Sequence, residues 1–189
     1  QLIELIRQQY NRPSICFWGL QNEVLEYAEC MPEFMAELND LAHKEDPTRL
    51  TTQATDKDAA KNWASDLIAW NRYPGWYFGT KEDMGADLDK NHAGDDRPFG
   101  ISEYGIGSNI EIHVDKATNA DKSLGAVQPE EYQNICHESF IPQINERSYL
   151  WATFNWNMFD FSSDMRAEGG LTGVNTKGLV TRDREVKKD

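Results

Sequence analysis

Two glutamates occupy the positions in this sequence that most clearly suggest chemistry. Glu23 closes the apolar segment PSICFWGLQNE, and Glu103 lies inside PFGISEYG. A carboxylate is costly beside a buried apolar strand unless it has a partner or a chemical role there. Glycoside hydrolysis uses two such carboxylates, one as proton donor and the other as nucleophile or base. The pair therefore makes a glycosidase the first functional hypothesis.

The elements that must position these glutamates follow from the spacing of apolar residues, which alternates between helical and strand-like periods. We expect helices over residues 1–10, 32–44 and 81–92 and from residue 129 onward, with a kink at Pro142. We expect strands over residues 14–20, 49–55, 66–73, 98–105 and within the aromatic segment 149–161. The glycine-rich segment 169–178 predicts a loop.

Strands that alternate with helices predict βα units and a parallel sheet, hence an α/β fold. A complete (β/α)8 barrel takes roughly 250 residues. The chain has 189 residues and starts on a helix, so the second half of a barrel fits better than a whole one. A small doubly wound sheet is the structural alternative. We expect residues 1–189 to be a single catalytic-domain segment with no second domain.

In parallel α/β folds, reactive groups gather at the carboxyl ends of the strands. Besides the two glutamates, two further predicted strands end in amide and aromatic side chains. These side chains are Asn71, Tyr73, Trp76 and Tyr77 after one strand, and Trp156, Asn157 and Asp160 after the other. The pattern predicts that both carboxylates, amides and aromatic rings share one rim.

The composition narrows the class of partner. The formal net charge of −13 argues against binding to nucleic acids or anionic membranes, which require basic surfaces. The abundant aromatic residues suit a protein core and also suit stacking on sugar rings. No segment is apolar enough to span a membrane, and the chain does not open on a signal peptide, so we expect a soluble protein of the cytoplasm or periplasm.

No metal site is predicted. Asp87, Asp89 and Asn91 match the first three ligand spacings of a calcium loop. However, His92 stands where that loop needs glycine, and Pro98 stands where it needs glutamate. A solvated acidic surface explains the three residues better.

No cofactor is predicted either. Gly105 and Gly107 begin a dinucleotide-binding motif but lack its third glycine. The three cysteines, Cys16, Cys30 and Cys136, have neither the spacing of metal ligands nor that of a disulfide framework.

Taken together, the motifs resemble those of family 2 glycoside hydrolases, which include β-galactosidases, β-glucuronidases and β-mannosidases. PSICFWGLQNE resembles the acid/base segment, NRYPGWY the next substrate-site segment, and PFGISEYG the nucleophile segment. FNWNMFDF, followed by GVNTKGLVTRDREVKKD, resembles the last barrel strand and the closing segment. The resemblance runs in the right order over nearly the whole chain. It implies a TIM barrel catalytic domain, of which this chain supplies about strands 4 to 8.

Residue by residue, the resemblance implies that Glu23 is the general acid/base and Glu103 the nucleophile. Asn22 would hydrogen-bond the sugar 2-hydroxyl, and the Tyr73 hydroxyl would support the nucleophile. Trp156 would form an aromatic floor under the sugar. The remaining implied substrate-binding residues are Asn71, Trp76, Asn175 and Lys177.

The choice of sugar depends on the closing segment. In β-glucuronidases an Asn-x-Lys pair such as Asn175 and Lys177 holds the sugar carboxylate. Many β-galactosidase-like members carry a similar segment, and their WNMFDF-type strand is closer to this one. We therefore rank terminal β-D-galactosides ahead of β-glucuronides as the carbohydrate substrate.

An open half barrel exposes a sheet edge and an apolar face. We expect these surfaces to pair with the rest of a barrel or with another copy of the chain. The alternative to an active enzyme is a non-catalytic fragment, a half-barrel module that keeps both carboxylates and is inactive alone.

Overall fold

The computed structural model describes residues 1–24, 28–57, 64–117 and 125–189. The chain forms two compact units. Unit 1 contains Gln1–Asn71, Asp95–Ser102 and Tyr149–Ala152, and unit 2 contains Arg72–Gly94, Glu103–Ser148 and Thr153–Asp189. Within the described ranges, no helix is both long enough and apolar enough to cross a membrane.

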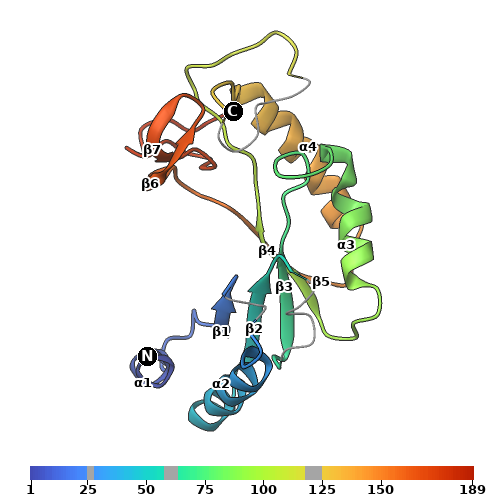
Figure 1. The fold of residues 1–189 in the computed structure, drawn as a ribbon, viewed down its shortest axis with the longest axis vertical. Coiled ribbons are helices and arrows are strands. Elements are labelled where there is room, and N and C mark those ends of the chain that lie inside the picture. The colour runs from blue at the N-terminus through green and yellow to red at the C-terminus, as the bar shows by residue number, and fades with distance from the viewer. Residues whose placement is uncertain (25–27, 58–63, 118–124) are drawn as a thin grey trace. The chain divides into compact units, whose positions relative to one another are not determined.

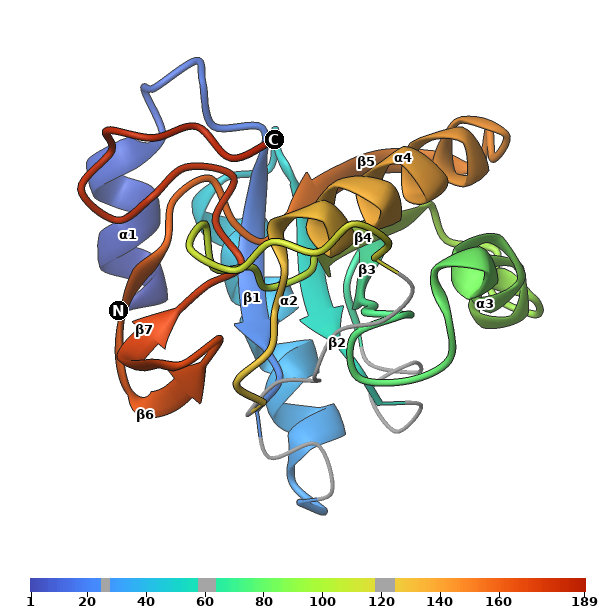
Figure 2. The same cartoon turned by 90° about the horizontal axis from the view of Figure 1, so that it is seen from above.

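Five strands form one sheet, in the order in which they occur along the chain. The strands are β1 (Phe17–Asn22), β2 (Leu50–Thr55), β3 (Leu67–Asn71), β4 (Phe99–Tyr104) and β5 (Leu150–Asn155). In unit 1, β2 runs parallel to both β1 and β3, and Figure 2 shows β1 and β2 pointing the same way. Every residue of β3 is buried. The predicted α/β fold with a partial parallel barrel sheet is confirmed.

The strand boundaries differ from the predictions by one to three residues, and two of the differences have a clear cause. The first strand begins at Phe17, later than predicted, because the Ile15 N–H donates to the Arg12 carbonyl (3.2 Å) and closes a turn. The third strand ends at Asn71. It does so because the Tyr73 carbonyl already accepts from the following turn, where Trp76 and Tyr77 lie.

The helices of unit 1 lie where the sequence predicts them. Helix α1 (Leu2–Gln9) contacts α2 (Met31–Glu45), and α2 contacts β1 and β2 (Figure 1). Ile6, Trp18 and Ala42, one from each of α1, β1 and α2, are buried together. This cluster joins both helices to the strand that leads to Glu23.

A buried carboxylate links the same elements. Asp46, directly after α2, is 4% exposed. Its Oδ2 accepts from Trp18 Nε1 (3.0 Å) and Arg49 Nη1 (2.6 Å), and its Oδ1 accepts from the Thr48 N–H (3.0 Å). Through these bonds, one side chain links the residues just before β2 to β1.

In unit 2, two helices lie side by side, as Figure 1 shows for α3 (Met84–His92) and α4 (Glu130–Asn145). A single 3-10 turn, η2 (Lys81–Asp83), precedes α3. Arg147 Nε donates to the Gly85 carbonyl (3.0 Å) and to Asp89 Oδ1 (3.0 Å), which ties the end of α4 to α3. Helix α4 continues past Pro142 to Asn145.

The glycine-rich segment contradicts its prediction as a loop. It supplies the turn and the second strand of an antiparallel hairpin formed by β6 (Phe161–Glu168) and β7 (Leu171–Asn175). Gly169 and Gly170 form the connection with φ angles of 56° and 76°. A two-residue hairpin turn with positive φ at both positions favours glycine, so the two glycines indicate a tight turn rather than an extended loop.

The Asp46 contacts predict a large stability effect. Asp46→Ala would leave the Trp18 N–H and the Arg49 guanidinium without their shared acceptor. We expect it to lower the free energy of unfolding by about 3–5 kcal/mol. Asp40→Ala, at an exposed position of α2, should change it by less than about 0.5 kcal/mol. Urea denaturation of both variants measures the difference, and equal small losses would contradict the role given to Asp46.

Candidate active site

Unit 1 brings three of the predicted site residues together. Glu23 directly follows β1, and Asn71 is the last residue of β3. Asn71 Nδ2 donates to Glu23 Oε1 (2.7 Å) and to Asn22 Oδ1 (2.9 Å). The Ser102 hydroxyl, near the end of β4, donates to Asn71 Oδ1 (2.6 Å). Asn71 is buried, whereas Asn22 and Glu23 are exposed. The buried amide of Asn71 therefore holds the exposed carboxylate of Glu23 by a hydrogen bond.

The backbone at Glu23 is unusual. Its φ of 47° lies in the left-handed region, which non-glycine residues seldom adopt. The Glu23 N–H donates to the Ala54 carbonyl (3.2 Å), and Gln21 Nε2 donates to the same carbonyl (2.8 Å). The left-handed turn is thus anchored to β2. Residues held in such regions cluster at functional sites.

Unit 2 brings Glu103 and Tyr73 together. The Tyr73 hydroxyl donates to Glu103 Oε2 at 2.6 Å, and the Arg72 N–H donates to the Glu103 carbonyl at 2.8 Å. The Tyr73 ring is buried and lies edge-on to Tyr77, with centroids 5.1 Å apart. A phenol donor at this distance favours the ionised form of a carboxylate.

Trp156 lies close to the end of β4. Its N–H donates to the Tyr104 carbonyl (2.7 Å), and its ring meets Phe161 edge-on at 5.8 Å. A Cβ on Gly105 would lie 2.3 Å from the Trp156 carbonyl oxygen, so only glycine permits this approach. The Trp156–Asn157 peptide bond is cis. The indole is partly exposed and so can meet a ligand.

Lys177 carries a buried ammonium group. Its side chain is 2% exposed, and its Nζ lies 5.7 Å from the ring centroid of the fully buried Trp76 and 6.0 Å from that of Tyr77. Glu168 Oε2 lies 3.6 Å away, and Nζ has no hydrogen-bond partner among the residues that the structure describes. Burial lowers the pKa of Lys177 to about 8, although the Glu168 charge opposes that shift.

Glu168 balances two cations. It is fully buried, accepts a short hydrogen bond from Arg166 Nη1, and accepts from the Thr176 N–H at 3.3 Å. Arg166 also donates to the Tyr77 hydroxyl at 3.1 Å. One carboxylate therefore serves both Arg166 and Lys177, so these cations are not fully neutralised by it.

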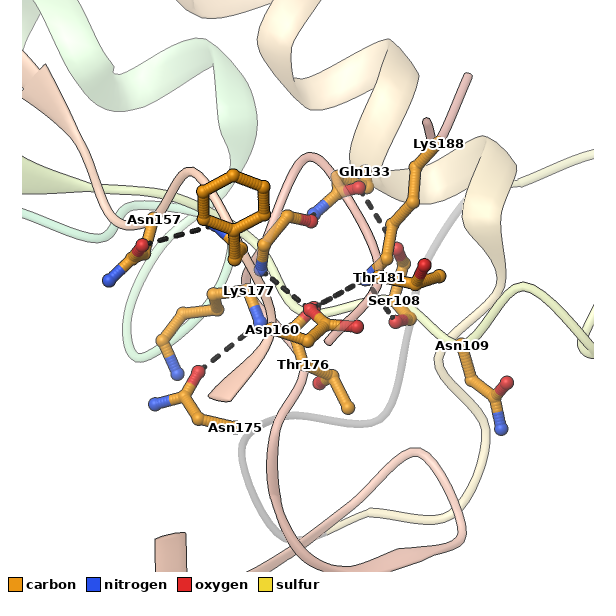
Figure 3. Close-up of polar contacts among 12 residues, drawn as sticks. Ser108, Asn109, Gln133, Asn157, Asp160, Asn175, Thr176, Lys177, Thr181 and Lys188 are labelled. Atoms are coloured by element: carbon orange, nitrogen blue, oxygen red, sulfur yellow. Dashed lines mark hydrogen bonds and ion pairs between the residues drawn. The ribbon is translucent and has the colours of Figure 1, made fainter. Parts of the chain in front are cut away.

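A second buried pair holds the segment that carries Lys177 (Figure 3). Lys188 Nζ donates to Asp160 Oδ1 and to the carbonyls of Ser108 and Thr176, each at 2.9 Å. Asp160 Oδ1 also accepts from the Gly178 N–H at 2.8 Å. Burial raises the pKa of Asp160 and lowers that of Lys188, and each partner's charge opposes the shift of the other.

Asn175, also predicted from the sequence, ends β7 and is buried. Its Oδ1 accepts from the Lys177 N–H at 3.2 Å. The Asn-x-Lys pair is thus a local turn whose amide side chain fixes the backbone at Lys177.

The sequence analysis does not predict three polar residues of the two units: Ser102 in unit 1, and Arg166 and Glu168 in unit 2. Arg166 and Glu168 share one side of β6, two residues apart and opposite in charge. Recognising the Gly169-Gly170 turn would have revealed that strand. In the described ranges, no group of three or more His, Cys, Asp or Glu side chains could hold a metal ion.

The contacts of Lys188 predict that its substitution lowers the free energy of unfolding, and the neighbouring Lys187 provides a control. Lys188→Met would leave the buried Asp160 carboxylate without its cation, and we expect the free energy of unfolding to fall by about 3–5 kcal/mol. Lys187→Met, at an exposed position, should cost less than about 0.5 kcal/mol. Urea denaturation compares the two variants, and equal costs would refute the anchoring role of Lys188.

Comparison with known proteins agrees with the motifs. Residues 1–189 match the family described as Glycosyl hydrolases family 2, TIM barrel domain. The chain is 48% identical to a β-glucuronidase of Bacteroides fragilis over 190 residues, covering 100% of the chain and 27% of that relative. The chain thus spans little more than a quarter of its relative's length.

Two solved structures are also similar. An FMN-binding β-glucuronidase from Facaelibacterium prausnitzii is 40% identical with a TM-score of 0.90, over 100% of this chain and 29% of that one. A Bacteroides fragilis protein provisionally named a β-galactosidase is 36% identical with a TM-score of 0.90, over the same shares. The chain belongs to glycosyl hydrolase family 2, and its partial parallel sheet is part of that family's TIM barrel domain.

Proposed function

We propose that this chain supplies both catalytic carboxylates of a retaining β-glycosidase, and that its preferred substrate is a β-D-glucuronide or a related β-uronide. Family membership and the Tyr73–Glu103 hydrogen bond support the first part. The buried, incompletely paired ammonium of Lys177 carries the second. We further propose that residues 1–189 belong to a single catalytic domain that is completed by the rest of a barrel.

The proposed reaction has two steps. Glu103 attacks the anomeric carbon while Glu23 protonates the departing oxygen, so a glycosyl ester forms as the glycosidic bond breaks. Glu23 then removes a proton from water, whose oxygen attacks the same carbon and releases Glu103. Tyr73 stabilises the charge of Glu103 before attack and after release. Trp156 supplies an apolar surface for the sugar ring.

The uronide preference rests on the charge around Lys177. A buried ammonium group requires hydrogen-bond acceptors, and Glu168, at 3.6 Å and shared with Arg166, supplies too little. A carboxylate at C6 of the sugar would provide the missing acceptor and a full opposite charge. Trp76 would act through Lys177, because the indole is fully buried beneath the ammonium.

A β-D-galactoside is the second candidate. The solved Bacteroides fragilis structure with a β-galactosidase name, at 36% identity, is the observation in its favour. A neutral hydroxymethyl group at C6 would leave Lys177 with only the carboxylate that it shares with Arg166. For that reason we rank the galactoside below the uronide, which reverses the order that the sequence motifs favour.

The proposed roles of the carboxylates are tested by substitution in the natively expressed protein that contains this chain. Glu103→Gln should reduce hydrolysis of an aryl β-glycoside to the uncatalysed level. Glu23→Ala should lower kcat by about 10²–10⁴-fold, and added azide should restore it as a glycosyl azide, since azide needs no general base. Glu111→Gln, at an exposed position, is the control. Hydrolysis that survives Glu103→Gln would refute the assignment.

The proposed sugar is tested by pH. Because Lys177 has a pKa of about 8, its ammonium is charged below that pH and is lost as the pH rises. KM for a β-glucuronide should therefore increase about tenfold for each unit above pH 8, whereas KM for the matching β-galactoside should not change.

Lys177→Met provides the control for this experiment, because it removes the charge and keeps an unbranched apolar side chain. The variant should lose both the glucuronide preference and the pH dependence of its KM. A wild-type KM for the galactoside that is lower than that for the glucuronide would favour the second candidate instead.

A further inference from the structure

The amide of Asn71 has no N–H left for a substrate. An asparagine side chain offers two N–H donors and one carbonyl acceptor. Both donors are used, one by Glu23 Oε1 at 2.7 Å and the other by Asn22 Oδ1 at 2.9 Å. The carbonyl accepts from the Ser102 hydroxyl at 2.6 Å. These contacts point to a role different from the direct sugar contact that the sequence resemblance implies.

The chemistry of the partners fixes the orientation of this amide. Whether Glu23 is ionised or carries a proton on Oε2, its Oε1 is an acceptor, so Asn71 turns its NH2 group, not its carbonyl, toward Oε1. The carbonyl then faces Ser102, whose hydroxyl must donate. The second N–H faces Asn22 Oδ1, which leaves the NH2 group of Asn22 available for the sugar.

We propose that Asn71, oriented by Ser102, is a positioning residue that occupies Oε1 of Glu23 and so reserves Oε2 for proton transfer. This inference rests on the proposed glycosidase function and deepens it by assigning the reactive oxygen of the acid/base. In the first step, the proton on Oε2 moves to the leaving oxygen as the glycosidic bond breaks. In the second step, Oε2 receives a proton from the attacking water.

The backbone makes such a restraint necessary. Glu23 is exposed, follows the end of β1, and has a φ of 47°. Its main chain is anchored through the Ala54 carbonyl, but that bond leaves the carboxylate free to rotate about its terminal torsion. The Asn71 bond is the described contact that distinguishes one carboxylate oxygen from the other.

The test compares leaving groups in the natively expressed protein. The quantity measured is kcat/KM, which reports the step in which Glu23 acts as an acid. A methyl glycoside needs that proton, whereas a 2,4-dinitrophenyl glycoside departs without it. Asn71→Ala should lower kcat/KM about 10- to 100-fold for the methyl glycoside and less than about threefold for the dinitrophenyl glycoside.

Ser102 variants test the orientation of the amide. Ser102→Ala should produce the same leaving-group dependence in weaker form, and Ser102→Thr, which keeps the hydroxyl, should restore wild-type behaviour. Ser65→Ala is the matched control, because it removes a buried hydroxyl whose bond to the Leu67 carbonyl lies at the other end of β3. It should show no leaving-group dependence.

Equal losses on both substrates in Asn71→Ala would overturn the proposal, since a structural or sugar-binding role does not depend on the leaving group. The proposed function fails in a different way: the wild type would not hydrolyse the aryl β-glycoside, or azide would not restore the activity of Glu23→Ala. A crystal structure of Asn71→Ala gives a readout without activity: we expect the Glu23 carboxylate to be rotated or disordered. A carboxylate in the wild-type orientation would also overturn the inference.

Discussion

A carboxylate can only accept hydrogen bonds, and this constraint organises both units of the chain. Each carboxylate near a strand end requires a donor from another segment: Asn71 for Glu23 in unit 1, and Tyr73 for Glu103 in unit 2. Asn71 is the last residue of β3, and Tyr73 follows it by two positions. One short segment of the chain therefore supplies a donor within each unit, Asn71 in unit 1 and Tyr73 in unit 2.

The sequence predicts this arrangement in outline because the information is local. Apolar runs mark the strands, and Glu23, Asn71 and Glu103 each end or nearly end one. The rule that parallel strands carry reactive groups at their carboxyl ends then selects the same residues. The role of the Tyr73 hydroxyl, by contrast, is implied by the resemblance of NRYPGWY to a segment of the family. Strand boundaries are predicted less precisely. At Phe17, for example, the apolar residues before the strand belong to a turn.

The contacts that orient Asn71 and bury Glu168 could not be predicted, because they join segments far apart in the sequence. Nothing near Ser102 indicates that its hydroxyl orients Asn71 from another strand. Glu168 gives the clearest case: a glutamate is usually exposed, yet this one is fully buried between Arg166 and Lys177. Its burial depends on the β6–β7 hairpin, and the glycines of that segment first suggested a loop.

Two lysines of the closing segment offer an internal comparison that bears on the substrate. Lys177 and Lys188 are almost equally buried, at 2% and 4% exposure. Lys188 meets three acceptors at 2.9 Å, one for each proton. Lys177 meets none within hydrogen-bonding distance among the described residues. Burial alone therefore does not explain why Lys177 lacks acceptors, since Lys188 is almost equally buried and has three. Under the proposed function, the acceptors of Lys177 arrive with an anionic sugar, whereas a neutral sugar would offer hydroxyl acceptors but no opposite charge.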